Sequence, residues 1–363
     1  MSYLHWRQCG GRELLKSEKY HQRSAGNQCE AIHPGYGFLS ENAGFAKLCE
    51  ENGIVFIGPK SEVISAMGDK DTSRQLMQQV GVPGCSRNGG SKDVEEAKKY
   101  AKEIGYPLLV KATAGGGGKG IRVVAREEDL ADAFHTASRE AESAFGNGDV
   151  FLEEYLTHVR HVEMQILADQ QGNILCLGER DCSLQLNKQK VLEETPSPVM
   201  TEDIRRKMMD AAVLAAKAAN YTNAGTVEFL LAPDGQFYFI EMNTRLQVEH
   251  PITEEISGVD IVKWQIRIAC QVPLNMKQED IRLQGHAIEC RINAEIPEKN
   301  FMPSPGVIKH LHLPAGNGVR VDTAIYTGYC IPSEYDSMIA KVIVHAPDRD
   351  AALQKMRSVL MRW

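Results

Sequence analysis

Two glutamates flank a turn signal and could share a metal ion. The segments on either side of Asp234-Gly235 are rich in apolar and β-branched residues, and this dipeptide is typical of a two-residue hairpin turn. Such a turn places Glu228 directly opposite Glu241, where two carboxylates repel each other. Pro233 cannot donate a ladder hydrogen bond, so a wider loop is the alternative. In either case we expect Mg²⁺ between the two acids, held also by substrate phosphates.

The segment after Glu241 adds further polar groups. If residues 241–249 continue as a strand, alternate side chains share one face. That face would carry a carboxylate, an amide, a guanidinium, an amide and a carboxylate: Glu241, Asn243, Arg245, Gln247 and Glu249. The alternative is an ordinary solvated face. We favour a site for a metal, an anion and a base, because a solvated face rarely starts opposite a second glutamate.

A run of glycines, residues 115–120, separates two strand-like segments, 108–111 and 121–124. A dinucleotide-binding loop needs a helix after the glycines, and a strand follows here instead. The pattern predicts a hairpin whose tip exposes backbone N–H groups and can close over phosphates, with Lys111 and Lys119 nearby. The alternative is a surface hairpin without a ligand.

Three other polar features are ambiguous on their own. The charged segment 179–190 is typical of a solvated loop, but Lys190 could supply a cation to the same site. His161, taken alone, is more often a structural histidine than a ligand. Arg291 alternates with apolar neighbours and could form an ordinary ion pair.

Helices and strands must position these residues. Thr201 is a good N-cap for the clearest helix, 201–219, whose apolar residues recur at helical spacing. A hairpin is expected between 162–167 and 173–177. Further helices are predicted at 42–52, 70–80, 93–104, 128–144 and from 348 to the last residue, Trp363, and a strand at 54–58. The pattern is α+β with several antiparallel hairpins.

Composition excludes several classes of protein. The chain has 363 residues, of which 43% are hydrophobic and 25% charged, and its net charge of −7 argues against binding nucleic acid or an anionic membrane. There is no apolar run long enough for a membrane span and no secretory signal. Nine cysteines without a C-x-x-C pair indicate buried free thiols in a reducing, cytoplasmic compartment. Residues 1–30 are atypical and poorly specified.

Seven motifs in order resemble biotin carboxylase, the ATP-grasp component of biotin-dependent carboxylases, and most of all the free-standing subunit of bacterial-type acetyl-CoA carboxylase. They are His33–Asn42, Met67–Lys70, Lys111–Gly120, Arg160–Gln165, Glu179–Ser183, Glu241–Glu254 and Gly285–Glu295. The resemblance implies an ATP-grasp fold, in α+β and α/β parts. Its domains would be a remnant of the N-terminal α/β domain (31–82), a lid (83–156), a core with the magnesium and bicarbonate site (157–270) and a truncated β-rich C-terminal domain (271–363).

The resemblance also implies a role for particular residues. ATP phosphates would be held by Lys70, Lys111, Gly117 and Gly118. The rest of the nucleotide would contact Glu153, Glu154, Tyr155, Leu156, His161, Gln185, Lys188 and Leu230. Mg²⁺ or Mn²⁺ would bind Glu228, Glu241 and Asn243. Bicarbonate would bind Lys190, Arg245, Gln247 and the backbone of Val248. Glu249 would be the base, and Arg291 would stabilise the enolate-like form of biotin.

The reaction implied is carboxylation of biotin on a biotin carboxyl carrier protein, driven by ATP and bicarbonate through carboxyphosphate. Carboxyltransferase subunits would be further partners, and the intact family forms homodimers. Alternatives are the same component of a propionyl-CoA, methylcrotonyl-CoA or pyruvate carboxylase, a ligase like carbamoyl-phosphate synthetase, or an inactive fragment acting only as an interaction module.

The sequence departs from the family at three places. Lys188 stands where the family carries a histidine that contacts the nucleotide, and two arginines before it are replaced by Leu186 and Asn187. Few residues precede His33, and the chain stops within a periodic helix. We therefore expect a chain truncated at both ends, with a nearly complete site on a destabilised scaffold.

Overall fold

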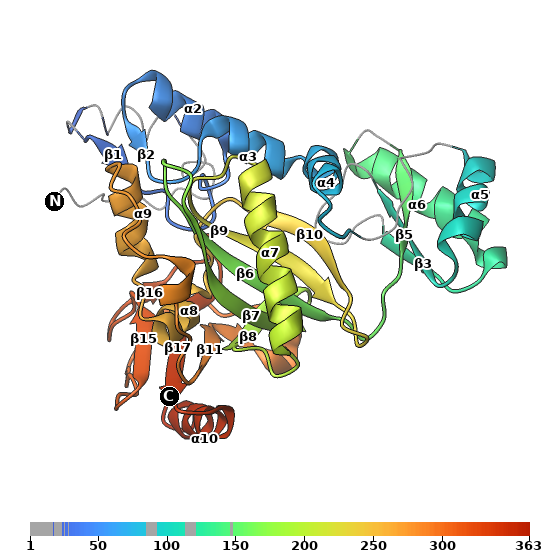
Figure 1. The fold of residues 1–363 in the computed structure, drawn as a ribbon. Helices are drawn as coiled ribbons and strands as arrows, with labels where there is room; N and C mark the ends of the chain where they lie inside the picture. Colours follow the sequence, from blue (N-terminus) through green and yellow to red (C-terminus); the bar gives the residue numbers. More distant parts are fainter. Residues whose placement is uncertain are drawn as a thin grey trace. The chain divides into compact units, whose positions relative to one another are not determined.

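The computed structural model describes residues 29–84, 93–112, 121–145 and 148–363, together with Ser17, Ser24, Gly26 and Asn27. These residues belong to two compact units (Figure 1). The larger unit comprises the described residues up to Val82, Arg160–Phe229 and Glu241–Trp363. The smaller unit comprises the described parts of Pro83–Val159, with Leu230–Ile240.

An eight-stranded sheet runs through the larger unit, and all its hydrogen-bonded pairs whose register is defined are antiparallel. The strand order is β10-β9-β6-β7-β8-β11-β17-β15. The strands are β6 (Arg160–Ala168), β7 (Ile174–Leu186), β8 (Gln189–Thr195), β9 (Asn223–Leu231), β10 (Phe237–Asn243), β11 (His286–Asn293), β15 (Val319–Thr323) and β17 (Met338–Ala346). The tip of the β9–β10 hairpin belongs to the smaller unit.

Local turn chemistry sets the first hairpin of this sheet. Asp169 accepts hydrogen bonds from the backbone N–H groups of Gln171 and Asn173, and Gly172 has φ of 89°. The hairpin predicted from sequence is therefore confirmed, with strands longer than expected. The charged segment 179–190 is not a solvated loop: most of it lies in β7 and β8, and Asn187 and Lys188 form the turn between them with φ of 50° and 67°.

The loop between β9 and β10 is wider than the predicted two-residue turn. The Ala232 N–H donates to the Gln236 carbonyl, and the Gly235 N–H donates to the Ala232 carbonyl. Gly235 takes the left-handed conformation, with φ of 85°. The expectation of a two-residue turn at Asp234-Gly235 is therefore wrong, because Pro233 lies inside the loop and cannot donate a ladder hydrogen bond.

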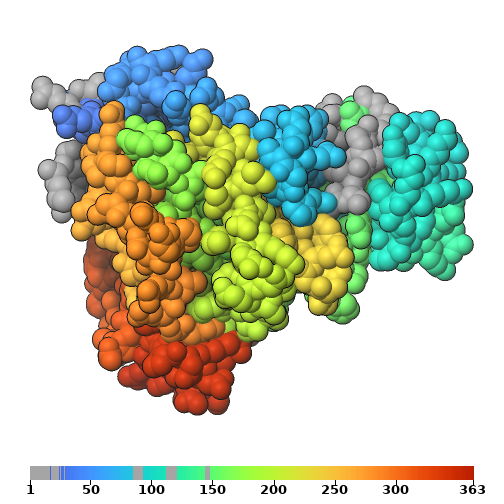
Figure 2. All heavy atoms as spheres, in the orientation of Figure 1, coloured from blue at the N-terminus to red at the C-terminus, as the bar shows by residue number. Residues whose placement is uncertain are grey.

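Helices cover the sheet of the larger unit. α7 (Glu202–Ala218) packs on β6 and β7, and its N-cap Thr201 accepts a hydrogen bond from the Ile204 N–H, as predicted (Figure 1). α8 (His250–Ser257) and α9 (Ile261–Ala269) follow β10. α10 (Arg349–Leu360) packs on β17 and β11, and Figure 2 shows its red atoms at one end of this unit. α10 ends at Leu360, so the expectation of a helix still running at Trp363 is wrong.

The N-terminal described residues form a small α/β layer. Strands β1 (Ala31–Ile32) and β2 (Val55–Phe56) pair in parallel. The helices are α2 (Ala43–Glu51), α3 (Ser61–Gly68) and α4 (Lys70–Gln79). α2 and α4 were predicted from sequence and α3 was not. Apolar residues from this layer, among them Phe45, Ile54 and Phe56, form one core cluster.

The smaller unit has its own sheet and core. Its antiparallel strands lie in the order β4-β3-β5, and they are β3 (Leu108–Ala112), β4 (Ile121–Val124) and β5 (Val150–Glu154). Leu108 pairs with Val124 and Lys111 with Ile121, which confirms the hairpin predicted around the glycine run. Helices α5 (Val94–Ile104) and α6 (Leu130–Phe145) pack against this sheet. Gly117, Gly118 and Lys119 lie outside the described residues.

Short elements complete the described chain: η1 (Glu127–Asp129), η2 (Gln278–Asp280), η3 (Pro297–Lys299), β12 (Glu295–Ile296), β13 (Met302–Pro303), β14 (Gly306–Val307) and β16 (Cys330–Ile331). None of the described helices has the length and apolar character that crossing a membrane requires. All the described cysteines are free, as expected. Cys49, Cys176 and Cys182 are buried, but Cys29, Cys270 and Cys330 are exposed, so the expectation of buried thiols fails for these three.

Candidate active site

The polar segment after β10 is not a continuous strand. β10 ends at Asn243 and α8 begins at His250, so the expectation of one strand across 241–249 is wrong. Glu249 directly precedes the helix, with φ of −82° and ψ of 10°. Alternating polar and apolar residues are compatible with a strand, but the chain leaves the sheet here to enter α8. The side chains predicted to share a strand face are brought together by this turn instead.

Lys190 on β8 lies among three carboxylates. Its Nζ atom is 2.6 Å from Glu163 Oε2, 3.0 Å from Glu228 Oε1 and 2.7 Å from Glu249 Oε1. Burial lowers the pKa of this ammonium group, but the carboxylates, Glu163 foremost, outweigh burial and raise it. Lys190 is therefore a fixed positive charge that joins β6, β9 and the residue before α8.

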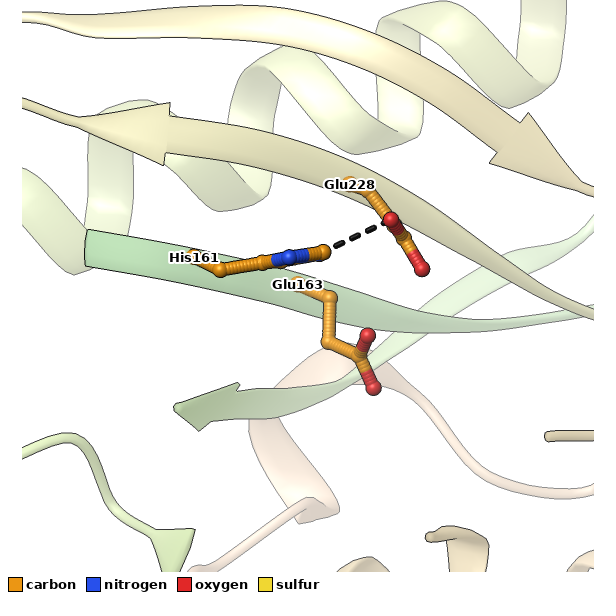
Figure 3. Close-up of side chains that lie close together, drawn as sticks. All are labelled: His161, Glu163 and Glu228. Carbon is orange, nitrogen blue, oxygen red and sulfur yellow. Dashed lines mark ion pairs between the residues drawn. The ribbon is translucent and has the colours of Figure 1, made fainter. Parts of the chain in front are cut away.

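Neighbouring strands β6 and β9 present a second cluster (Figure 3). His161 and Glu163 project from β6 and Glu228 from β9, and their ligand atoms all lie within 4.8 Å of one another. His161 Nε2 is 2.8 Å from Glu228 Oε2, and Gln185 Nε2 is 3.1 Å from His161 Nδ1. Burial lowers the pKa of His161, but the hydrogen bond to Glu228 outweighs burial and raises it.

Glu228 is the most heavily bonded of the predicted metal ligands. Its Oε1 atom also accepts hydrogen bonds from Asn243 Nδ2 and Gln247 Nε2, each at 2.9 Å. Burial raises the pKa of this carboxyl, but Lys190 and His161 outweigh burial and lower it. Glu228 is therefore ionised across the neutral range.

Glu241 on β10 has no such partners. Among the described residues, no hydrogen bond or ion pair joins its carboxylate, and burial and the Glu228 charge raise its pKa, with Lys70 acting in the opposite direction. A cavity of about 180 Å³ opens beside it, lined also by Lys70, Glu41 and Asn243. Two nearby carboxylates with an amide oxygen are a donor set that suits a hard divalent cation. The residues present therefore fit the metal site predicted from sequence.

Arg245 is held by a residue that the sequence analysis missed. Its Nε atom donates to Glu41 Oε2 at 2.8 Å, and Glu41 Oε1 accepts the Thr244 N–H at 3.1 Å. A further hydrogen bond joins Arg245 Nη2 to Asn243 Oδ1 at 3.1 Å. Glu41 lies within the His33–Asn42 motif, where an acid among apolar and glycine residues was the available signal.

Arg291 on β11 connects Glu249 to a second missed residue, Glu193 on β8. Arg291 Nε donates to Glu193 Oε1 at 2.8 Å, and Arg291 Nη2 donates to Glu249 Oε2 at 2.9 Å. Burial raises the pKa of Glu249, but Lys190 and Arg291 outweigh burial and lower it. In this arrangement Glu249 is an ionised carboxylate between two cations.

Beneath this layer lies Arg180 of β7, which is fully buried. It donates to Glu163 Oε1 at 2.5 Å and to Gln247 Oε1 at 2.9 Å, and also to Gln165, Thr226 and Thr253. By orienting the Gln247 amide, it aims the opposite amide nitrogen at Glu228. The available signal for Arg180 was its place between two acids in the Glu179–Ser183 motif.

The remaining predicted nucleotide residues lie elsewhere in the chain. In the smaller unit Lys111 Nζ is 2.5 Å from Glu153 Oε1, across β3 and β5. Glu154 ends β5, and Tyr155 and Leu156 follow it. Leu230 belongs to the same unit, in the part of β9 beyond Phe229. Lys188, in the turn between β7 and β8, is exposed.

Family models first define the class of protein. The ATP-binding domain of the carbamoyl-phosphate synthase L chain matches residues 69–277, and solved ATP-grasp structures share the fold, so the chain is an ATP-grasp ligase. The biotin carboxylase N-terminal domain matches residues 11–64, and the biotin carboxylase C-terminal domain matches residues 289–363. The chain belongs to the biotin carboxylase family. The N-terminal match begins inside the segment 1–30 that was expected to be atypical.

Relatives support this assignment over most of the chain. Biotin carboxylase 1 of Bacillus subtilis is 56% identical over 336 residues, which are 92% of this chain and 75% of that protein. The 2-oxoglutarate carboxylase small subunit of Hydrogenobacter thermophilus is 55% identical over 332 residues, 91% of this chain and 70% of that protein. A pyruvate carboxylase subunit of Methanothermobacter thermautotrophicus is 52% identical over 335 residues, which are 92% of this chain and 68% of that protein.

The solved structures similar to this fold include two of biotin carboxylases. The biotin carboxylase domain dimer of the H. thermophilus 2-oxoglutarate carboxylase, in complex with MgADP, ADP and bicarbonate, has a TM-score of 0.88 and 53% identity, covering 96% of this chain and 77% of that one. The biotin carboxylase of Campylobacter jejuni, solved as a β,γ-ATP complex, has a TM-score of 0.90 and 46% identity. The similarity covers 96% of this chain and 78% of that one.

Proposed function

We propose that this chain carboxylates biotin on a separate carrier protein, using ATP and bicarbonate, as the first half-reaction of acetyl-CoA carboxylase. One observation carries the proposal: the Glu249 carboxylate lies between Lys190 at 2.7 Å and Arg291 at 2.9 Å. Such an arrangement suits a base that must act beside a bound anion. The related H. thermophilus domain was solved with MgADP and bicarbonate, which supports the same ligands here.

Bicarbonate binding is the first step. Lys190, Arg245, Gln247 and the Val248 N–H hold the anion, and Glu249 removes its proton. Lys190 and Arg291 lower the pKa of Glu249. An anion that draws these cations toward itself weakens their hold on Glu249, so the carboxylate becomes a stronger base as its substrate binds.

Phosphoryl transfer from ATP then gives carboxyphosphate. Glu228, Glu241 and Asn243 would hold Mg²⁺ or Mn²⁺, and the bound ion would supply positive charge for phosphoryl transfer. Lys70 and Lys111 would each bind phosphate oxygens, and the resemblance assigns the same ligand to Gly117 and Gly118, which lie outside the described residues. The other predicted nucleotide residues contact the base and ribose of ATP.

Carboxyphosphate separates into CO₂ and phosphate. The phosphate takes the proton from biotin N1, and N1 attacks CO₂ to give carboxybiotin. The Arg291 guanidinium stabilises the negative charge that develops on the ureido oxygen of biotin. The chain's own residues must also exclude water, because carboxyphosphate otherwise hydrolyses without product.

The partners proposed are a biotin carboxyl carrier protein, carboxyltransferase subunits and a second copy of the chain, in the cytoplasm. A second candidate is the same component of a 2-oxo acid carboxylase. It is favoured by the relatives named as 2-oxoglutarate and pyruvate carboxylase subunits. Transfer from carboxybiotin to acetyl-CoA, pyruvate or 2-oxoglutarate, measured with each purified transferase partner, distinguishes these acceptors.

Bicarbonate-dependent ATP hydrolysis by the purified chain tests the activity. We expect stimulation by free biotin, and its loss in Arg245→Ala. The matched control is Arg206→Ala, which removes an exposed arginine paired with Asp203 on α7. A folded protein whose ATP hydrolysis does not respond to bicarbonate and biotin would instead favour the inactive interaction module.

A further inference from the structure

Two buried glutamates face each other behind Arg291. Glu193 on β8 and Glu289 on β11 are directly opposite residues of an antiparallel pair, and neither is exposed to solvent. Directly opposite side chains of such a pair have Cβ atoms about 5 Å apart, close enough for their carboxyl groups to bond. Arg291 lies two residues after Glu289 and therefore on the same face of the sheet.

The hydrogen bonds of this pair are uneven. Glu193 Oε1 accepts from Arg291, whereas Glu193 Oε2 and both carboxyl oxygens of Glu289 are buried without a hydrogen-bond partner among the described residues. A buried carboxylate with no donor is strongly unfavourable, and a carboxylic acid that donates to a neighbouring carboxylate is not. One proton between the two groups satisfies Glu193 Oε2 and one oxygen of Glu289 together.

Charged groups act on Glu289 from β8, from β11 itself, from β17 and from the residue before α8. Glu193 lies on β8, Arg291 on β11 itself, and Glu249 before α8. On β17 the buried Lys341 lies opposite Arg291, and its Nζ atom donates to the Val248 carbonyl at 2.7 Å.

The remaining groups of this cluster leave few cations for Glu289. Lys341 Nζ is 3.7 Å from Asp322 and 5.5 Å from the centre of the Tyr36 ring. The Glu289 charge also acts on the Tyr36 phenol, where it raises the pKa together with burial. Arg291 is shared between Glu193 and Glu249. No cation is thus left to pair with Glu289 alone among these neighbours.

We propose that Glu193 and Glu289 share one proton, with the Glu289 O–H donating to Glu193 Oε2, and that this pair positions Arg291 for biotin. Glu193 is then the charged member that anchors Arg291 through Nε, and Glu289 is a neutral positioning residue. Arg291 Nη2 lies 2.6 Å from Glu193 Oε1 and 2.9 Å from Glu249 Oε2, and it is the end of the side chain that turns to the ureido oxygen when biotin binds. The functional part of this inference rests on the proposed role of Arg291.

The direction of the pKa shifts agrees with this assignment. Burial raises the pKa of Glu193 to about 7, against the opposing effect of Arg291. Burial raises the pKa of Glu289 well above the usual carboxyl range, and Glu193 and Glu249 raise it further, against the opposing effect of Lys341. Both groups therefore favour protonation, and Glu289 favours it more.

Thermal unfolding of Glu289→Gln tests the shared proton without relying on activity. Wild-type folding near neutral pH must take up a proton that the unfolded glutamate, with a pKa near 4.5, has lost. The amide N–H of glutamine can donate a hydrogen bond in place of the Glu289 O–H, and folding of the variant needs no proton uptake at this position. The unfolding midpoint of Glu289→Gln minus that of wild type should therefore increase by about 3 to 5 °C when the pH is raised from 5 to 8.

The matched control is Glu194→Gln, one residue along β8, whose carboxylate pairs with His286 and Arg349. Its midpoint should fall below that of wild type at pH 8. A fall for Glu289→Gln at pH 8, a difference that does not change with pH, or a failure of Glu289→Gln to fold would each overturn the shared proton.

Kinetics of biotin-stimulated ATP hydrolysis test the positioning role. Glu193→Gln should raise the KM for free biotin about tenfold or more and leave the KM for ATP within about twofold. Glu289→Gln should keep the KM for biotin within about twofold at pH 7. An unchanged KM for biotin in Glu193→Gln would overturn the positioning role. A chain with no bicarbonate-dependent hydrolysis would instead reject the proposed function and leave the unfolding test decisive for the proton.

Discussion

Replacing Lys190 with methionine removes one cation from three buried carboxylates. Lys190 Nζ lies within 3.0 Å of an oxygen of Glu163, Glu228 and Glu249. Breaking a buried ion pair from one side costs about 3 to 5 kcal/mol, because the remaining charge is left without its partner. With an unfolding entropy of about 2.1 cal/mol/K per residue over 363 residues, this cost lowers the midpoint of cooperative unfolding by about 4 to 7 °C.

The loss should depend on pH in a defined direction. Lys190 lowers the pKa of Glu228 and Glu249, so these groups stabilise wild type above the usual carboxyl pKa near 4.5, and this stability is lost as the pH falls through their lowered pKa values. Without Lys190 burial raises their pKa values, and the variant loses stability as the pH rises. The gap between the two midpoints should therefore widen from pH 5 to pH 8.

Scanning calorimetry at pH 5, 6.5 and 8 measures this gap, with Lys207→Met as the matched control. Lys207 pairs with Asp203 on the exposed face of α7, so its removal should cost less than about 1 kcal/mol. A midpoint of Lys190→Met within about 1 °C of wild type at pH 8, or a gap that narrows as the pH rises, would refute the reasoning.

Three further changes have separate readouts. Glu241→Gln should weaken the activation of ATP hydrolysis by Mg²⁺ at least tenfold. Without metal its unfolding midpoint should equal or exceed that of wild type, because the substitution removes repulsion from Glu228. A magnesium titration and calorimetry measure the two effects, and a lower midpoint would contradict the unpaired state of the Glu241 carboxylate. Glu41→Gln should raise the KM for bicarbonate about tenfold by releasing Arg245, and an unchanged KM would remove Glu41 from the site. Thr201→Ala should lower the free energy of unfolding by about 1 kcal/mol in urea with activity intact, and no loss would mean that water replaces the cap.

Local elements were predictable from neighbouring residues. Thr201 and the spacing of apolar residues define α7, and the turn at Asp169–Gly172 defines the β6–β7 hairpin, because caps and tight turns depend on residues a few positions apart. Candidate site residues were also proposed from the sequence without reference to their positions in space: Glu228 from the turn signal, Lys190 from the charged segment 179–190 and Arg291 from the motif Gly285–Glu295.

Predictions that depended on residues far apart in the sequence were less successful. Alternation in residues 241–249 predicted one strand, but β10 ends at Asn243 and α8 begins at His250. A single strand and a turn into a helix share that pattern, and only the packing of α8 against β8 and β11 distinguishes them. Glu41, far away in the sequence, reaches Arg245 only because the fold brings the α2 layer beside this turn.

Sequence alone determined which side chains are available for chemistry and the short elements that carry them. Tertiary structure decided which of them meet: Lys190 acquires three carboxylates from β6, β9 and the start of α8, and Glu193 faces Glu289 because β8 and β11 pair in one register. Strand register and burial are set by the free energy of the whole sheet, so a carboxyl group's partner, charge and pKa are not encoded by the residues next to it in the chain.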